Sequence, residues 1–177
     1  DVHHIDVLTN GNITIKEKTN DLRVGEIEST AGDVTLASPA AIIDALNDGI
    51  LGTADLIARN ITMTAGNNLI GDTDDQSRRG GVGTPGNFLE TDVDANGGAL
   101  GVLNVTDTAS DTTPFVATPF NPAGSGTYGV FLTELSGNLN VGLVHTKGDV
   151  SLVTKPGSGS IIDAFDEGLK ELARGKR

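Results

Sequence analysis

The sequence predicts an all-β protein folded as a β-solenoid, which is a stack of coils built from short strands. Three observations predict this fold: a recurring strand signature, glycine and asparagine corners ahead of it, and a near absence of large aromatic side chains. The 177 residues include 24 glycines and no tryptophan, and only 3% are aromatic. A core of Val, Ile, Leu and Ala suits narrow, repetitive packing better than the mixed core of a typical globular domain.

The strand signature is a glycine or polar residue, then an asparagine or aspartate, then an apolar, a polar and an apolar residue. This alternation is typical of a short strand with one aliphatic face. Glycine, asparagine and aspartate tolerate left-handed backbone angles, so each corner allows a sharp turn at the same place. The signature occurs at residues 11–15, 21–24, 32–36, 60–63, 104–106, 137–141 and 148–152.

The distance between corners predicts the length of one coil. Asn12 and Asp33 are 21 residues apart, which suits one circuit of a β-solenoid. Because alternate residues of a strand face opposite sides, we expect Thr14 and Thr35 to face water. The expected core residues of these strands are Ile13, Ile15, Val34 and Leu36.

A longer repeat is superimposed on the strand signature. Residues 13–50 align with residues 130–169 at offsets of 116 to 119 residues, with small insertions in loops. Chance is a poor explanation for a register held over this length. The matched segments are residues 22–25 with 139–142, 32–36 with 148–152, and 42–45 with 161–164.

This long repeat predicts the domain organisation. Residues 1–128 form a first β-helical repeat unit, and residues 129–177 form a partial second repeat that ends in a tail or short C-terminal helix. At roughly 20 to 25 residues per coil, one long repeat would contain about five coils. Residues 71–80 and 114–126 read as loop excursions, and loops on a rigid scaffold commonly carry binding specificity.

An antiparallel, immunoglobulin-like β-sandwich is the alternative architecture, because such domains also occur in tandem and have about 100 residues. The missing core tryptophan argues against it. The corner shared by all copies of the strand signature also argues against it, since a sandwich requires no common corner.

Composition excludes several classes of partner. The chain has 24 acidic and 12 basic residues, a net charge of −12, so we expect no binding to nucleic acid. No apolar run approaches the roughly 20 residues that span a bilayer, so we expect no membrane insertion. Cysteine is absent, which rules out disulfides and thiolate metal sites.

Four segments resemble a known group of repeats. Residues 24–29, 31–36, 54–66 and 81–90 look like the repeats of very large bacterial surface exoproteins, similar to filamentous haemagglutinin and RTX-type giant adhesins. The resemblance implies a right-handed parallel β-helix in a secreted or cell-surface protein. It also implies a role in adhesion, biofilm or sheath formation.

These observations favour a non-enzymatic structural module of an extracellular adhesin, stalk or filament, which associates with neighbouring repeats or with copies of itself through open strand edges. The alternative is an adhesin segment that binds a glycan or a host protein through the two excursions. A polysaccharide lyase or hydrolase is a third reading, because such β-helix enzymes use clustered carboxylates. The acidic residues are spread through turns here, whereas an enzyme should have a single acid-rich groove.

One weak metal site is present in the sequence. Asp92, Asp94 and Asn96 match the first half of a calcium loop, in which alternate oxygens converge on one hard cation. The twelfth position is Leu103, where that loop needs a bidentate glutamate, and a plain turn between strands explains the same residues. We predict no catalytic residue, and no cofactor other than calcium at these three positions.

Overall fold

The computed structural model describes residues 3–66, 80–93, 101–108 and 129–165. These residues form β-strands and one 3-10 turn, η1 (Gly49–Leu51), and no described helix has the length and apolar character that crossing a membrane requires. The first sheet contains β1 (Ile5–Thr9), β3 (Leu22–Ser29), β5 (Ile42–Asp44), β6 (Leu56–Ala58), β8 (Leu89–Val93), β10 (Gly129–Glu134) and β12 (Asp149–Thr154). The second sheet contains β2 (Ile13–Lys16), β4 (Val34–Ala37), β7 (Ile61–Ala65), β9 (Leu103–Asp107), β11 (Leu139–His145) and β13 (Ile161–Asp163).

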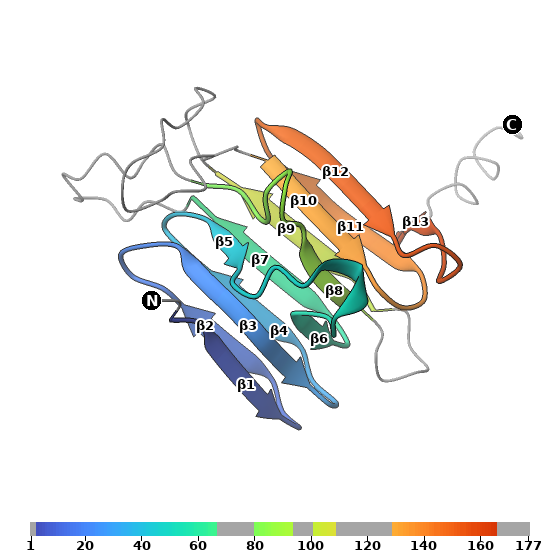
Figure 1. The fold of residues 1–177 in the computed structure, drawn as a ribbon, viewed down its shortest axis with the longest axis horizontal. Coiled ribbons are helices and arrows are strands. Elements are labelled where there is room, and N and C mark those ends of the chain that lie inside the picture. Colours follow the sequence, from blue (N-terminus) through green and yellow to red (C-terminus); the bar gives the residue numbers. More distant parts are fainter. Residues whose placement is uncertain (1–2, 67–79, 94–100, 109–128, 166–177) are drawn as a thin grey trace, which may run out of the picture.

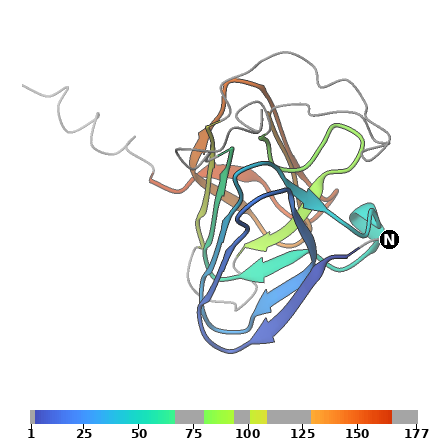
Figure 2. The same ribbon diagram turned by 90° about the vertical axis from the view of Figure 1, so that its left-hand side faces the viewer.

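The chain passes repeatedly from one sheet to the other. All ladders between the named strands are parallel. Figures 1 and 2 show the two sheets facing each other, with successive circuits stacked side by side along the sheets. The prediction of an all-β, solenoid-like fold is confirmed at this level, and an antiparallel immunoglobulin-like sandwich fits the parallel ladders poorly.

The core is made of columns of aliphatic side chains that run from circuit to circuit. In the second sheet, one column joins Ile13, Val34, Ile61, Leu103 and Val141 through successive parallel pairs. Its three central members are fully buried. Each column excludes water from the space between the sheets, which is the main source of stability in such a fold.

The inward and outward positions predicted for the first strands are largely correct. Val34 and Leu36 are fully buried, and Thr14 is exposed. Ile15 is only half-buried, because β2 is the last strand of its sheet and no described strand pairs with its outer edge. Thr35 is likewise half-buried.

The corner residues have a second role that the sequence did not indicate. The side-chain oxygen of a corner residue accepts a hydrogen bond from a backbone N–H of the next circuit. Asn12 Oδ1 accepts from Asp33 N at 3.0 Å, and Asn138 Oδ1 accepts from Ser160 N at 2.9 Å. A Cβ on Gly32 would collide with the Asn12 backbone, so this glycine is needed for the close approach of two circuits.

The circuits differ in length. Successive members of the Ile13 column are 21, 27, 42 and 38 residues apart. From β3 to β11 the chain changes sheet seven times, which is three and a half circuits. The expectation of about five coils per long repeat was therefore wrong, because the circuits between Val34 and Val141 take 27 to 42 residues, longer than the 20 to 25 expected.

Candidate functional site

The calcium loop expected from the sequence is only partly described. Asp92 lies in β8, where it pairs with Ile57, and Leu103 begins β9. Asp94 and Asn96 lie outside the described residues, so this site stays a prediction. Residues 114–126, most of 71–80, and the C-terminal residues 166–177 also lie outside the described part.

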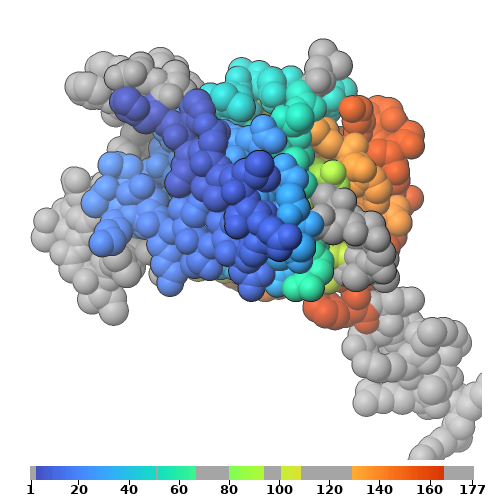
Figure 3. All heavy atoms as spheres, turned by 90° about the horizontal axis from the view of Figure 1, so that it is seen from below, coloured from blue at the N-terminus to red at the C-terminus, as the bar shows by residue number. Residues whose placement is uncertain are grey.

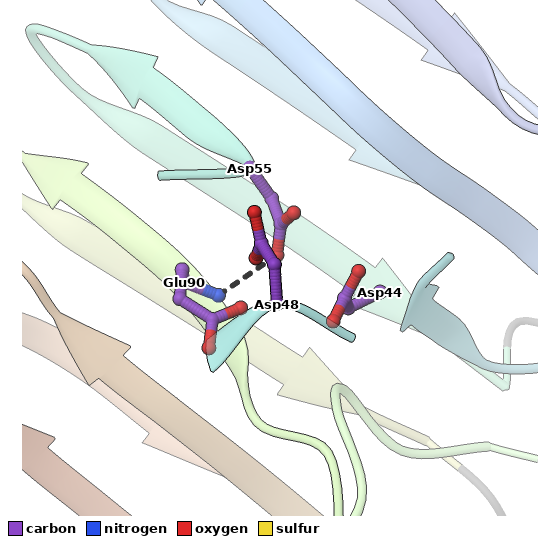
Figure 4. A group of neighbouring side chains, drawn as sticks. All are labelled: Asp44, Asp48, Asp55 and Glu90. Atoms are coloured by element: carbon purple, nitrogen blue, oxygen red, sulfur yellow. Dashed lines mark hydrogen bonds between the residues drawn. The ribbon is translucent and has the colours of Figure 1, made fainter. Parts of the chain in front are cut away.

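A different group of acids converges in the first sheet. Asp44, Asp48, Asp55 and Glu90, here called the acid cluster, each place one carboxylate oxygen within 4.8 Å of the others. Figure 4 shows the four side chains grouped together, with the carboxylates of Asp48 and Asp55 between those of Glu90 and Asp44. The expectation that the acidic residues are spread through turns was wrong at this place.

The acid cluster lies where the first sheet is interrupted. β3 runs unbroken, but the next circuit is divided into β5 and β6, which both pair with β3. The following circuit is divided again, because Val82 pairs with Ile42 and β8 pairs with β6. The loops that leave the sheet at these two breaks, residues 45–55 and 83–88, are called the two sheet loops. They cover the outer face of the sheet beside Glu90 (Figure 1).

The first sheet loop begins with a tight turn organised by Asp44. Its Oδ1 accepts a hydrogen bond from Leu46 N at 2.6 Å, and its Oδ2 accepts one from Asn47 N at 2.8 Å. Asn47 has a φ of 53°, a left-handed conformation that asparagine tolerates better than most residues. This turn brings the chain back so that Asp48 comes close to Asp44.

Asp48 is the solvent-facing member of the acid cluster. It is exposed, whereas Asp44 is only 4% exposed. Its carboxylate folds over Gly52, where a Cβ would collide with both carboxylate oxygens. The glycine therefore leaves the space that lets Asp48 approach the other acids.

Asp55 and Glu90 form the buried side of the acid cluster. Each is 2% exposed, and Asp55 Oδ2 accepts a hydrogen bond from Glu90 N at 2.9 Å. Burial raises the pKa of Asp55 to about 9, assisted by the nearby carboxylates of Glu90 and Asp44. Burial also raises the pKa of Glu90, with the charges of Asp44 and Asp48 adding to the effect.

Glu90 has an unsatisfied oxygen. Its Oε2 is buried and has no hydrogen-bond partner among the residues that the structure describes. The other fully buried glutamate, Glu134, is different: its Oε1 accepts from Val93 N at 2.9 Å and its Oε2 from Thr91 Oγ1 at 2.8 Å. A buried polar atom without a partner costs about 1 to 3 kcal/mol, so native proteins seldom leave one.

A cavity of about 290 Å³ adjoins the acid cluster. It lies between the two sheet loops, and Glu90 and Thr133 line it together with Asn47, Phe88 and several smaller residues. Phe88 is held by an edge-to-face contact with Phe131, with ring centroids 5.7 Å apart. Among the described residues that line the cavity, Glu90 is the titratable one, and none is a lysine, arginine or histidine.

The sequence offered only a partial signal for this site. Asp44 and Asp48 were visible as part of the long repeat, and Asp55 follows within the same loop. Glu90 belongs to the next circuit, and the length of the intervening segment hides its position beside Asp55. Comparisons of the chain with protein-family models, with curated proteins and with solved structures find no match.

Proposed function

We propose that the chain is a non-enzymatic structural module of an extracellular bacterial surface protein, a right-handed parallel β-helix whose ends dock onto further coils of the same kind. One observation carries the proposal: two columns of core residues end half exposed at the last circuit. Val150 is 51% exposed and Ile161 is 47% exposed. The resemblance of the repeats to bacterial surface exoproteins supports the location.

These two residues continue columns that are buried elsewhere. Val150 pairs with Val130, and Ile161 pairs with Leu139; both partners are fully buried. β12 and β13 are also the last strands of their sheets, so among the described residues no strand pairs with their outer edges. Such an edge carries apolar side chains and open backbone groups, both of which favour association.

The proposed occupant of this edge is the N-terminal circuit of a second copy. β1 and β2 end the two sheets at the opposite end of the stack, and in Figure 3 no described segment lies in front of them. Because all ladders are parallel, docking this end onto β12 and β13 would continue the same pattern head to tail. The net charge of −12 opposes association, so salt should favour it.

The test compares two lysine substitutions in the second sheet. Ile161→Lys places a charge at the edge of the last circuit. Leu143→Lys is the control, because this side chain is similarly exposed, at 49%, but does not belong to the last strand of the sheet. Leu143 lies in β11 and pairs with Asn104 of β9. Light scattering coupled to gel filtration, and electron microscopy over a concentration range, would measure association.

We expect the wild-type protein and Leu143→Lys to form head-to-tail oligomers as the concentration rises, and Ile161→Lys to stay monomeric. The two variants should unfold at similar temperatures, since both side chains are half exposed. A wild-type protein that remains monomeric at all concentrations, or equal loss of association in both variants, would overturn the proposal.

The acid cluster favours a second candidate, a polysaccharide lyase or hydrolase. A single group of converging acids is the expected mark of such an enzyme, and among the described residues such a group occurs once. Three of its four members are buried, however, and none of the described residues lining the cavity is a lysine, arginine or histidine. An assay for sugar release from polysaccharides, with Glu90→Gln as the inactive control, separates this candidate from a structural module.

A further inference from the structure

We propose that Asp44, Asp48, Asp55 and Glu90 bind one hard divalent cation, Ca²⁺ in preference to Mg²⁺, which fastens the first sheet loop to β8. This site is separate from the loop that begins at Asp92, although Glu90 and Asp92 both lie in β8. It does not depend on the end-to-end docking proposed above.

The donor set determines the class of cation. All four groups are carboxylates, which are the ligands of hard cations, and neither histidine nor cysteine belongs to the group. They come from β5, from both ends of the first sheet loop, and from β8 of the next circuit (Figure 4). An ion among them would therefore join two successive circuits at the point where the sheet is interrupted.

The unsatisfied oxygen of Glu90 points independently to a ligand. Its side chain is 98% buried, and one oxygen of its carboxylate lies within 4.8 Å of an oxygen of each of the other three acids. Within the described part of the chain no group donates to Oε2, so this buried acceptor is open to a bound species. A cation supplies this interaction and also offsets the repulsion among four neighbouring carboxylates.

The number of carboxylates favours calcium. The oxygens of the acid cluster all lie within 4.8 Å of one another, so one ion can contact them together. Ca²⁺ takes six to eight oxygen ligands at about 2.3–2.6 Å in a flexible geometry, which suits four carboxylates. Mg²⁺ is usually bound by one or two carboxylates and keeps several waters, so four converging acids suit it less well.

The site is also accessible. Asp48 is exposed, and the cavity of about 290 Å³ reaches Glu90 from the surface between the two sheet loops. The cavity is large enough for water molecules, which commonly complete the six to eight ligands of calcium. The ion can therefore enter the folded protein.

The experiment uses the full chain after removal of metals with a chelator. Calorimetric titration measures Ca²⁺ and Mg²⁺ binding, and thermal melts measure stabilisation. We expect one Ca²⁺ per chain, weaker Mg²⁺ binding, and a melting temperature that rises with Ca²⁺ concentration, since an ion that binds only the folded state stabilises it.

Four variants locate the ion. Glu90→Gln should weaken Ca²⁺ binding by more than about tenfold, because it removes a charged ligand. Asp48→Asn should also weaken binding, and it alters an exposed side chain whose change leaves the fold intact. Asp163→Asn, the counterpart of Asp44 in the partial second repeat, and Asp94→Asn, in the loop predicted from sequence, should bind Ca²⁺ as the wild type does.

Absence of Ca²⁺ binding by the wild-type protein would overturn the proposal. So would equal affinity in the wild type, Glu90→Gln and Asp48→Asn. Loss of binding in Asp94→Asn alone would assign the ion to the loop of Asp92 instead. If Glu90→Gln fails to fold, as circular dichroism would reveal, the result for Asp48→Asn decides the matter.

Discussion

The strand pair β3–β5 and the strand pair β11–β13 have the same local structure in different surroundings. Val24 pairs with Asp44 in the first, and Val141 pairs with Asp163 in the second. The hydrogen bond that closes the turn after each pair is also the same: Ala45 N donates to Val24 O at 2.8 Å, and Ala164 N donates to Val141 O at 3.0 Å. The two pairs nevertheless lie in opposite sheets, because three and a half circuits separate them.

Burial distinguishes the two pairs. Ile42 is fully buried and Ile161 is 47% exposed; Asp44 is 4% exposed, while Asp163 is exposed. The difference arises because Val82 of the next circuit pairs with Ile42, whereas among the described residues no strand follows β13. The repeat thus encodes the path of one circuit, and a buried acid site forms only when the next circuit stacks on it.

The largest expected effect comes from shortening the equivalent isoleucines. Ile42→Ala leaves a cavity in the core and should lower the free energy of unfolding by about 2–5 kcal/mol. Ile161→Ala removes a half-exposed side chain and should cost below about 1 kcal/mol. Urea unfolding of the two variants measures both values. Equal costs would mean that Ile161 is buried in solution, as it would be in an oligomer, so dilution should then restore the difference.

The second effect concerns pH and the buried Asp55. The ordinary pKa of Asp55 is 3.8 and its pKa in the folded protein is about 9, so between these values the folded state holds more protons than the unfolded state. Without calcium, this group should therefore lower the free energy of unfolding as pH rises through that range, by at most about 1.4 kcal/mol per pH unit.

Unfolding measured from pH 5 to 9 in the presence of a chelator tests this dependence. Asp55→Asn should flatten the pH dependence and make the protein more stable than the wild type at pH 8. A wild-type stability that rises steadily across this range would contradict the raised pKa.

The sequence could predict the features that are local. The alternation of Val34, Thr35 and Leu36 is a property of one strand, and the corner at Asn12 is a property of one turn. Both occur where the sequence places them, because their cause lies within a few residues. The long repeat predicts strands in the same way, one matched segment at a time, and β3 and β11 begin at matched positions.

The acid cluster could not be predicted in the same way. Asp55 and Glu90 are 35 residues apart, and their contact depends on the number of residues between β7 and β8. Circuit length varies from 21 to 42 residues, so spacing in the sequence does not fix which residues are neighbours across circuits. The same variation made the expected coil number too high.

The smallest expected effect isolates Asp48, the one exposed member of the acid cluster. A Cβ at Gly52 would occupy the place of the Asp48 carboxylate, so Gly52→Ala should turn that side chain away into solvent. Because Gly52 has a φ of −85°, alanine adopts its backbone without strain, and the free energy of unfolding without calcium should change by less than about 0.5 kcal/mol. Calcium affinity should fall several-fold, which titration calorimetry would detect.

Gly11→Ala is the matched control, because a Cβ there meets nothing within 4 Å, and it should leave both the free energy of unfolding and the calcium affinity unchanged. Unaltered calcium affinity in Gly52→Ala would mean that the ion is held without Asp48, by the three buried acids alone.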